Sequence, residues 1–275
     1  MDPNKVLKKI TKKTSAIIIT HIYGLPVDLD NLKKICKDNK IFLIEDTAEA
    51  IAWITAALKS DSTHVAVDTE TTGLYPRDGY ILGISLSVDD EHGVYISTDC
   101  IDDEATDLLQ TLFIEKNVIM HNAKFDLAML EYHFNFEFPT IDDTMLMSYM
   151  LNEVPGNHGL KGLAIKHTPY GDYEKPMYDF IDDYCRRNGM LKGDFTWDMI
   201  PFDLMQVYAA MDACVTYRIY KVFKEELDKD PQIRRVYKNL LIPAMRFLKE
   251  AQDAGVPFDR KRLEVSQNIM EADIQ

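Results

Sequence analysis

Short apolar runs alternate with polar segments in the chain between residues 60 and 120. Branched and aromatic residues dominate these runs, and turn-forming or acidic residues separate them, which is typical of β-strands. The first connections are short, whereas the later ones contain apolar residues at helical spacing. This order predicts a mixed sheet with helices on its faces. We expect the strands at residues 65–67, 80–88, 92–98 and 117–120.

Apolar residues recur every three to four positions in other segments, as in amphipathic helices. Most of these segments lie after Lys124, so we expect the rest of the chain to be mainly helical. Residues 168–196 hold three Gly and two Pro, which predicts an irregular or partly helical insertion. The helices are expected at residues 48–58, 103–113, 125–132, 142–151, 160–167, 201–228 and 231–254, the last one interrupted or kinked at Pro243.

The first 50 residues differ from the remainder in charge. They hold nine Lys, no Arg and seven acidic residues, for a net charge of +2, whereas the remainder carries −16. Within them, strands at 16–19 and 41–44 flank a helix at 28–39, which predicts one β-α-β unit. The shift indicates a boundary near residues 46 to 52.

Composition limits the classes of function. No apolar run is long enough, at about 18 residues, to span a membrane. The four cysteines are scattered, with no Cys-x-x-Cys pair, so we expect neither a zinc site nor a disulfide framework and place the protein in a reducing cytoplasm. The net charge of −14 argues against a large electrostatic nucleic-acid footprint. It is compatible with a nuclease whose carboxylates bind metal ions.

Two carboxylates follow the strand at residues 65–67. Asp68 and Glu70 are two positions apart, so both side chains project from the same face of the strand. Adjacent like charges repel unless a cation lies between them, and a divalent ion with oxygen ligands is the usual one. Taken alone, the pair also fits an exposed acidic turn.

Two further groups carry candidate chemistry. Asn122 lies at the end of the fourth strand, and Asp126 lies in the first turn of the next helix. Tyr208 and Asp212 are four positions apart on the long helix, so they share one face. Singly, Asp126 also fits a helix N-terminus, Tyr208 a core position and Asp212 a solvated charge.

Together, Asp68-x-Glu70, Asn122-x-x-x-Asp126 and Tyr208-x-x-x-Asp212 resemble the tyrosine branch of the DEDD 3′–5′ exonucleases. The resemblance is strongest to the proofreading domain of family A, DNA polymerase I-like enzymes, and spans about residues 48 to 265. It implies an α/β, ribonuclease-H-like fold: a mixed five-stranded sheet flanked by helices, here with the extra N-terminal β-α-β unit. We expect domains at 1–47, 48–230 and 231–275, the last resembling the helical start of a polymerase domain. Since the chain ends at Gln275, we expect no polymerase activity from it alone.

The resemblance also implies a mechanism with two divalent ions, Mg²⁺ or Mn²⁺, roughly 4 Å apart. Asp68 would bridge both ions, Glu70 and Asp212 would bind the ion that activates water, and Asp126 would hold the second ion through water. Tyr208 would orient the attacking water, because a phenol with a pKa near 10 is not a base at neutral pH. His64 and His121 flank the motifs, and we interpret both as incidental.

The expected substrate is a single-stranded or frayed DNA 3′ end, which enters without a melting cost. Thr71, Leu74 and Asn122 would surround the terminal nucleotide, and Phe125 would pack beneath the site. Release of nucleoside monophosphates in a bacterial or phage-infected cell is the expected activity. Two alternatives remain open: an RNase D-like RNA 3′-end exonuclease, and a non-catalytic nucleic-acid-binding module of the same fold.

The N-terminal unit has a second resemblance. Ser15 to Asp30 and Ile44 to Ala50 resemble sugar-nucleotide aminotransferases that use pyridoxal phosphate, a family in which the residue matching Asp46 pairs with the pyridinium nitrogen. The family's phosphate-binding residues and Schiff-base lysine have no counterpart in this sequence, and without that lysine no internal aldimine forms. We therefore expect no pyridoxal phosphate and interpret residues 1–47 as a non-functional remnant.

Overall fold

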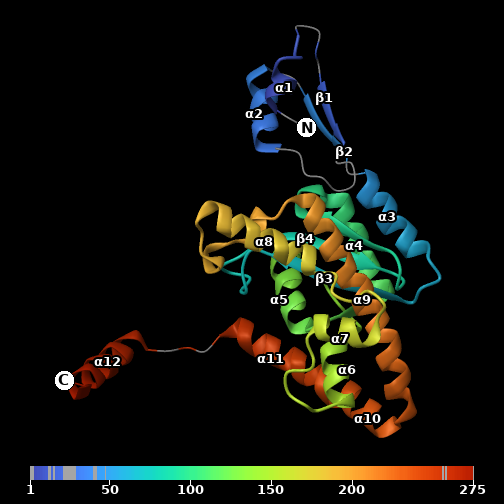
Figure 1. Ribbon diagram of the computed structural model, residues 1–275, viewed down its shortest axis with the longest axis vertical. Coiled ribbons are helices and arrows are strands. Elements are labelled where there is room, and N and C mark those ends of the chain that lie inside the picture. The colour runs from blue at the N-terminus through green and yellow to red at the C-terminus, as the bar shows by residue number, and fades with distance from the viewer. Residues whose placement is uncertain are drawn as a thin grey trace.

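The computed structural model describes residues 3–11, 14, 16–20, 29–39, 42–46, 48–255, 257 and 259–274. Its centre is a five-stranded mixed sheet in the order β5-β4-β3-β6-β7 (Figure 1). β3 pairs antiparallel with β4 and parallel with β6, β4 pairs antiparallel with β5, and β6 pairs parallel with β7. The strands are β3 (His64–Thr71), β4 (Ile81–Ser87), β5 (Gly93–Ser97), β6 (Asn117–Met120) and β7 (Ile141–Asp143).

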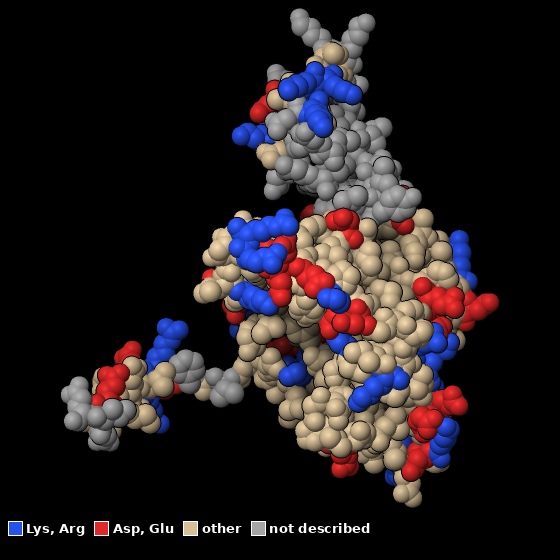
Figure 2. Space-filling model, viewed as in Figure 1, with Lys and Arg blue, Asp and Glu red and all other residues tan. Residues whose placement is uncertain are grey.

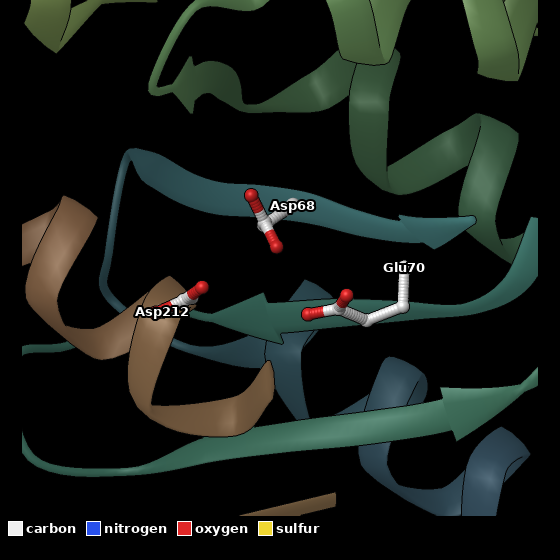
Figure 3. A group of neighbouring side chains, drawn as sticks. All are labelled: Asp68, Glu70 and Asp212. Carbon is white, nitrogen blue, oxygen red and sulfur yellow. The ribbon is translucent and has the colours of Figure 1, made fainter. Parts of the chain in front are cut away.

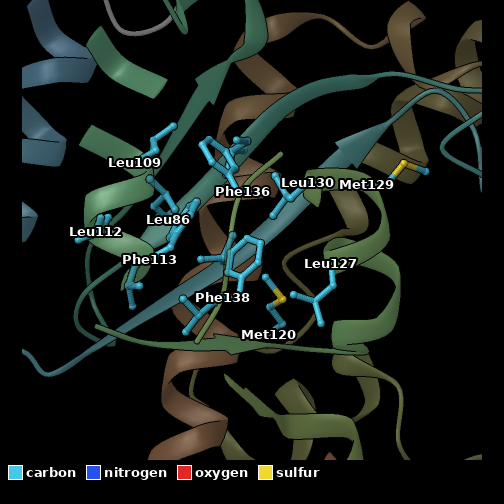
Figure 4. Close-up of a cluster of buried hydrophobic side chains, with 14 of the residues drawn as sticks. Leu86, Leu109, Leu112, Phe113, Met120, Leu127, Met129, Leu130, Phe136 and Phe138 are labelled. Atoms are coloured by element: carbon cyan, nitrogen blue, oxygen red, sulfur yellow. The ribbon is translucent and has the colours of Figure 1, made fainter. Parts of the chain in front are cut away.

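Helices cover both faces of this sheet. On one face, α3, α4 and α5 pack with alternate strand residues such as Val65 and Val67 in a large apolar cluster (Figure 4). On the other face, α6, α7 and α9 pack with the intervening residues Ala66 and Ile119. The helices are α3 (Ala48–Lys59), α4 (Asp103–Glu115), α5 (Ala123–Phe134), α6 (Thr144–Leu151), α7 (Leu160–His167) and α9 (Phe202–Lys229). The prediction of a mixed sheet with helices on its faces is therefore confirmed. Successive side chains of a strand point to opposite faces of the sheet, so alternate residues contact the two different sets of helices.

Three elements differ from the prediction. β7 was not predicted, and the helix expected from residue 142 begins at Thr144, because a three-residue strand has no readable pattern and exists through its pairing with β6. Within residues 168–196 the expected partly helical structure is confirmed, since α8 (Lys175–Asn188) is a helix that ends at Gly189 in the left-handed conformation. α12 (Arg260–Ile274) was not predicted either.

The helical segment after α9 is interrupted, as expected. α10 (Pro231–Val236) and α11 (Ile242–Ala254) are joined by a π-helical turn over Tyr237–Leu241, so the interruption precedes Pro243 rather than falling on it. The buried Tyr237 in this turn donates a hydrogen bond to Asp142 Oδ1 (2.9 Å) and accepts one from the backbone N–H of Asp143 (2.8 Å). The turn therefore anchors β7 to the C-terminal helices.

The N-terminal segment forms a separate two-stranded parallel sheet (Figure 1). β1 (Ala16–Thr20) pairs with β2 (Phe42–Asp46), and α2 (Leu29–Asn39) lies between them in the chain, after a short α1 (Pro3–Leu7). This confirms the β-α-β unit. The expected helix start at Asp28, the strand start at Ile41 and residues 21–27 of the aminotransferase-like stretch lie outside the described residues.

Two general properties of the structure are the charge of its surface and the apolar character of its helices. Acidic and basic side chains are interspersed over the face of the main body that Figure 2 shows. Among the helices that the structure describes, none combines the length and apolar character needed to cross a bilayer.

Candidate active site

Asp68 and Glu70 lie near the end of β3 and face α9. They continue the face of Ala66, which packs in the cluster containing α9 residues Val215 and Ile219. The β3–β4 register shifts between Glu70 and Thr71, so the ladder is irregular where the acidic side chains lie. Such bulges re-aim side chains next to functional sites.

Asp212 approaches the same point from α9. Carboxylate oxygens of Asp68, Glu70 and Asp212 all lie within 4.8 Å of one another and converge on one space (Figure 3). The helix approaches the sheet closely at Gly93 on β5, where an added Cβ would lie 2.4 Å from the Ala210 carbonyl oxygen. The absence of a side chain at Gly93 therefore allows α9 to bring Asp212 to β3.

Asp126 lies beside this group without being part of it. Its Oδ1 accepts hydrogen bonds from the backbone N–H (3.0 Å) and the hydroxyl (2.7 Å) of Thr69, and the side chain is 2% exposed. Both Thr69 bonds use Oδ1, which leaves Oδ2 for a water or a cation. The start of α5 is fixed by Asp143, which accepts hydrogen bonds from the N–H groups of Asn122 (3.3 Å) and Ala123 (2.9 Å).

Burial raises the pKa values of three carboxyl groups of the site, those of Asp68, Glu70 and Asp126. Burial, reinforced by the charges of Asp126, Asp212 and Glu70, holds the pKa of Asp68 well above its ordinary value. Burial and the charge of Asp212 raise the pKa of Glu70 to about 8, and burial raises that of Asp126 to about 7 although the Thr69 hydrogen bonds oppose it. Full ionisation of this cluster therefore requires a compensating cation.

Two residues that the sequence analysis missed contact Asp212. Lys161 at the start of α7 and Tyr173, before α8, both donate hydrogen bonds to its Oδ1. Lys161 Nζ also donates to the Tyr173 hydroxyl (3.0 Å). No local pattern marks either residue, since Lys161 resembles any lysine of a short helix and Tyr173 lies in the stretch predicted as irregular or partly helical.

Tyr208 lies one turn before Asp212, as its spacing predicted, and is 7% exposed. Its ring lies near those of Trp197 (centroids 5.8 Å apart) and Tyr173 (6.4 Å), and Lys161 Nζ lies 4.3 Å from the ring centroid. Burial and the neighbouring carboxylates raise the pKa of the phenol, so Tyr208 is neutral over the working pH range. A neutral phenol hydroxyl can donate a hydrogen bond but does not act as a base.

The four residues expected around a terminal nucleotide have different settings. Leu74 is 77% exposed and lies three residues after the end of β3, and the half-buried Thr71 donates a hydrogen bond to the Gly73 carbonyl (2.9 Å). Asn122 adopts the left-handed conformation (φ 66°) at the start of α5, a backbone state that concentrates at functional sites. Phe125 is partly buried and packs against the large apolar cluster.

The two histidines that flank the motifs form hydrogen bonds with hydroxyl groups outside the acidic cluster. His64 binds the hydroxyls of Tyr220 (2.8 Å) and Thr63 (2.8 Å) at the far end of β3. His121 binds the Thr144 hydroxyl (2.8 Å), and burial lowers its pKa to about 4, so it is uncharged at neutral pH. Neither contact involves the carboxylates.

The donor set fits a hard divalent cation. Asp68, Glu70 and Asp212 supply only carboxylate oxygens, which are the ligands that Mg²⁺ and Mn²⁺ prefer. The three carboxylates repel one another, and this repulsion contributes to the raised pKa values of Asp68 and Glu70. A bound divalent ion would relieve it.

Comparison with known proteins gives the family. A model of a 3′–5′ exonuclease family matches residues 41–228, and a model of the DegT/DnrJ/EryC1/StrS aminotransferase family matches residues 1–60. The DNA polymerase of Escherichia phage T5 is 38% identical over 247 residues, which cover 87% of this chain and 29% of that protein. The aligned part covers 23% of the DNA polymerase I of Rhizobium leguminosarum and 16% of the DNA polymerase of Bacillus phage SP01, so the chain spans a minor part of the length of these relatives.

Solved structures share the fold at low sequence identity. A structure of the POL domain of Pol1 from M. smegmatis, in complex with DNA primer-template and dNTP, has a TM-score of 0.60 at 18% identity, covering 82% of this chain and 34% of that one. Escherichia coli RNase D, an exoribonuclease, has a TM-score of 0.52 at 14% identity, covering 74% and 48%. The family match over residues 41–228 and the shared fold lead to one conclusion: the chain belongs to the 3′–5′ exonuclease domain family of family A DNA polymerases.

Proposed function

We propose that residues 48–230 hydrolyse single-stranded or frayed DNA from the 3′ end and release nucleoside monophosphates, using two divalent metal ions. The convergence of Asp68, Glu70 and Asp212 within 4.8 Å, in a chain of the exonuclease family, is the observation that carries this proposal. The phage and bacterial DNA polymerases among its relatives support DNA as the substrate, proofreading as the role and a bacterial or phage-infected cell as the location.

Each acidic residue has a separate task in this proposal. Bound ions would lower the pKa of the attacking water and neutralise charge on the scissile phosphate. Asp68 would contact both ions, whereas Glu70 and Asp212 would hold the ion on the water side. Asp126, with Oδ2 free of the Thr69 bonds, would hold the second ion through water.

The chain's other residues act on the water and the substrate. Tyr208 would orient the water through its neutral hydroxyl, and its ring is held in place by the aromatic neighbours. Leu74, exposed three residues after the end of β3, would contact the terminal base, together with Thr71 and Asn122, and Phe125 would pack beneath the site. The mixed surface charge means that the metal ions, rather than a basic surface, would meet the phosphate.

The test uses 5′-labelled single-stranded oligonucleotides of matched DNA and RNA sequence, with Mg²⁺ or Mn²⁺ and with EDTA. The wild-type chain should shorten DNA from the 3′ end, and Asp68→Asn or Asp212→Asn should lower the rate by about 100-fold or more, because a metal ligand is lost. Asp179→Asn is the matched control, since Asp179 is an exposed acid paired with Lys175 on α8.

Three results would contradict the proposal. Full activity of either site variant would exclude the site assignment, and metal binding with no hydrolysis of either strand would favour a non-catalytic binding module. Faster shortening of RNA than of DNA would assign the chain to RNA 3′-end processing.

A further inference from the structure

A lysine side chain points into the acidic site. The Lys161 side chain is 27% exposed, and its Nζ donates hydrogen bonds to Asp212 Oδ1 and to the Tyr173 hydroxyl (3.0 Å). The same Nζ lies 4.3 Å from the centroid of the Tyr208 ring and 4.7 Å from that of Tyr173. One ammonium group therefore contacts an acid of the cluster and both tyrosines beside it.

The position of Lys161 also matters for the charge of the site. Asp68, Glu70 and Asp212 place three carboxylates around one point, with Asp126 beside them. Lys161 opposes them: its charge is a cause that lowers the pKa values of Asp68 and Glu70, against the effect of burial. An ammonium on a stem of four methylene groups is mobile enough to leave such a position when a stronger cation arrives.

We propose that Lys161 is a positioning residue that acts as a tethered counter-cation: it holds Asp212 and the Tyr208 ring in place without metal and competes with the divalent ion for Asp212. This role rests on the metal site of the proposed function. In this role Lys161 sets the affinity of the site for the metal ion, which is a property separate from the chemical step.

Competition follows from the hydrogen bond itself. Lys161 occupies one of the two carboxylate oxygens of Asp212, and its ammonium repels any second cation placed beside that carboxylate. Removing the ammonium should tighten metal binding and, at the same time, destabilise the metal-free protein, because a nearly buried carboxylate loses its charged partner and keeps only the Tyr173 hydroxyl among the described residues. A lysine with only a structural role would lower both properties together.

The test measures Mn²⁺ binding to the intact chain by isothermal titration calorimetry without nucleic acid. Lys161→Met should bind Mn²⁺ about tenfold more tightly than the wild type, while its melting temperature in EDTA falls. Lys161→Arg, which keeps the charge, should bind Mn²⁺ within about threefold of the wild type. Lys166→Met is the matched control, since Lys166 is an exposed lysine of the same helix, and it should change neither quantity.

The outcomes separate this inference from the proposed function. Wild-type binding of Mn²⁺ with unchanged or weaker binding by Lys161→Met would overturn the role of Lys161 and leave the metal site standing. No Mn²⁺ binding by the wild type would overturn the metal site and this inference with it. If Lys161→Met does not fold in EDTA, Lys161→Gln provides the same comparison, and equal affinity of Lys161→Gln and the wild type would also overturn the role.

Discussion

Replacing Gly93 with alanine should lower the rate of hydrolysis, although Gly93 is not one of the residues of the site. The new Cβ on β5 would lie 2.4 Å from the carbonyl oxygen of Ala210 and 2.8 Å from Cys214 Sγ, whereas ordinary contact begins at 3.4 Å. The carbonyl is backbone, so no rotamer change relieves the clash, and α9 must move away from the sheet by about 1 Å. Ala210 is two residues from Asp212 and two from Tyr208, so both would move with the helix.

The expected size follows from this displacement. Overpacking of this kind costs about 1–3 kcal/mol of unfolding free energy. A shift of about 1 Å in a catalytic group lowers the rate by about 100-fold. Urea unfolding and single-strand DNA hydrolysis with Mn²⁺ measure the two effects on one preparation. Relieving only the sulfur contact, in the double variant Gly93→Ala/Cys214→Ala, should not restore activity because the carbonyl clash persists.

Gly162→Ala is the matched control. Gly162 lies in α7, and apart from its chain neighbours and the adjacent backbone of its own helix no heavy atom of the described residues lies within 4 Å of its added Cβ. In a helix this change is expected to stabilise the protein by about 0.5–1 kcal/mol and to leave the rate unchanged. Gly93→Ala activity within twofold of the wild type, at an unchanged unfolding midpoint, would refute the reasoning that close packing of α9 on β5 places Asp212.

Two further predictions concern charge and packing. Burial and nearby carboxylates raise the folded-state pKa values of Glu70 and Asp126 above their unfolded values, to about 8 and about 7, so protonation favours the folded state. The melting temperature in EDTA should therefore fall as pH rises from about 5 to 8, and Mn²⁺ should remove this dependence; a melting temperature that rises with pH in EDTA contradicts the prediction. Tyr237→Phe should lower the unfolding free energy by about 1–3 kcal/mol, because the buried Asp143 N–H loses its acceptor, while hydrolysis stays near wild type. An unchanged urea midpoint would show that the hydrogen bonds of Tyr237 do not stabilise β7.

Spacing within single elements follows from the order of residues alone. The period of two places Asp68 and Glu70 on one strand face, and the spacing of four places Tyr208 and Asp212 on one helix face. The same periodicities indicate the four longer strands, most of the helices and the parallel β-α-β unit. The interruption after α10 was expected, although the sequence located it at Pro243 and the structure locates it in the turn at Tyr237–Leu241.

Features that depend on contacts between elements do not follow from local patterns. β7 is too short to show a pattern and is defined by its partner β6. α8 lies in a stretch that the sequence predicted as irregular or partly helical without giving the bounds of a helix, and Gly189 ends this helix. Lys161 and Tyr173 contact Asp212 through chain segments 51 and 39 residues away, so no local motif connects them to it.

The sequence by itself determined which residue types share a face of each strand or helix, because the backbone repeats are local. The tertiary structure decided which of those faces meet: that α9 approaches β3 closely enough to join Asp212 to Asp68 and Glu70, that Asp126 is held by Thr69, and that Lys161 lies against the cluster. These distances depend on how the sheet and helices pack, a property of the whole core that no short stretch of sequence encodes.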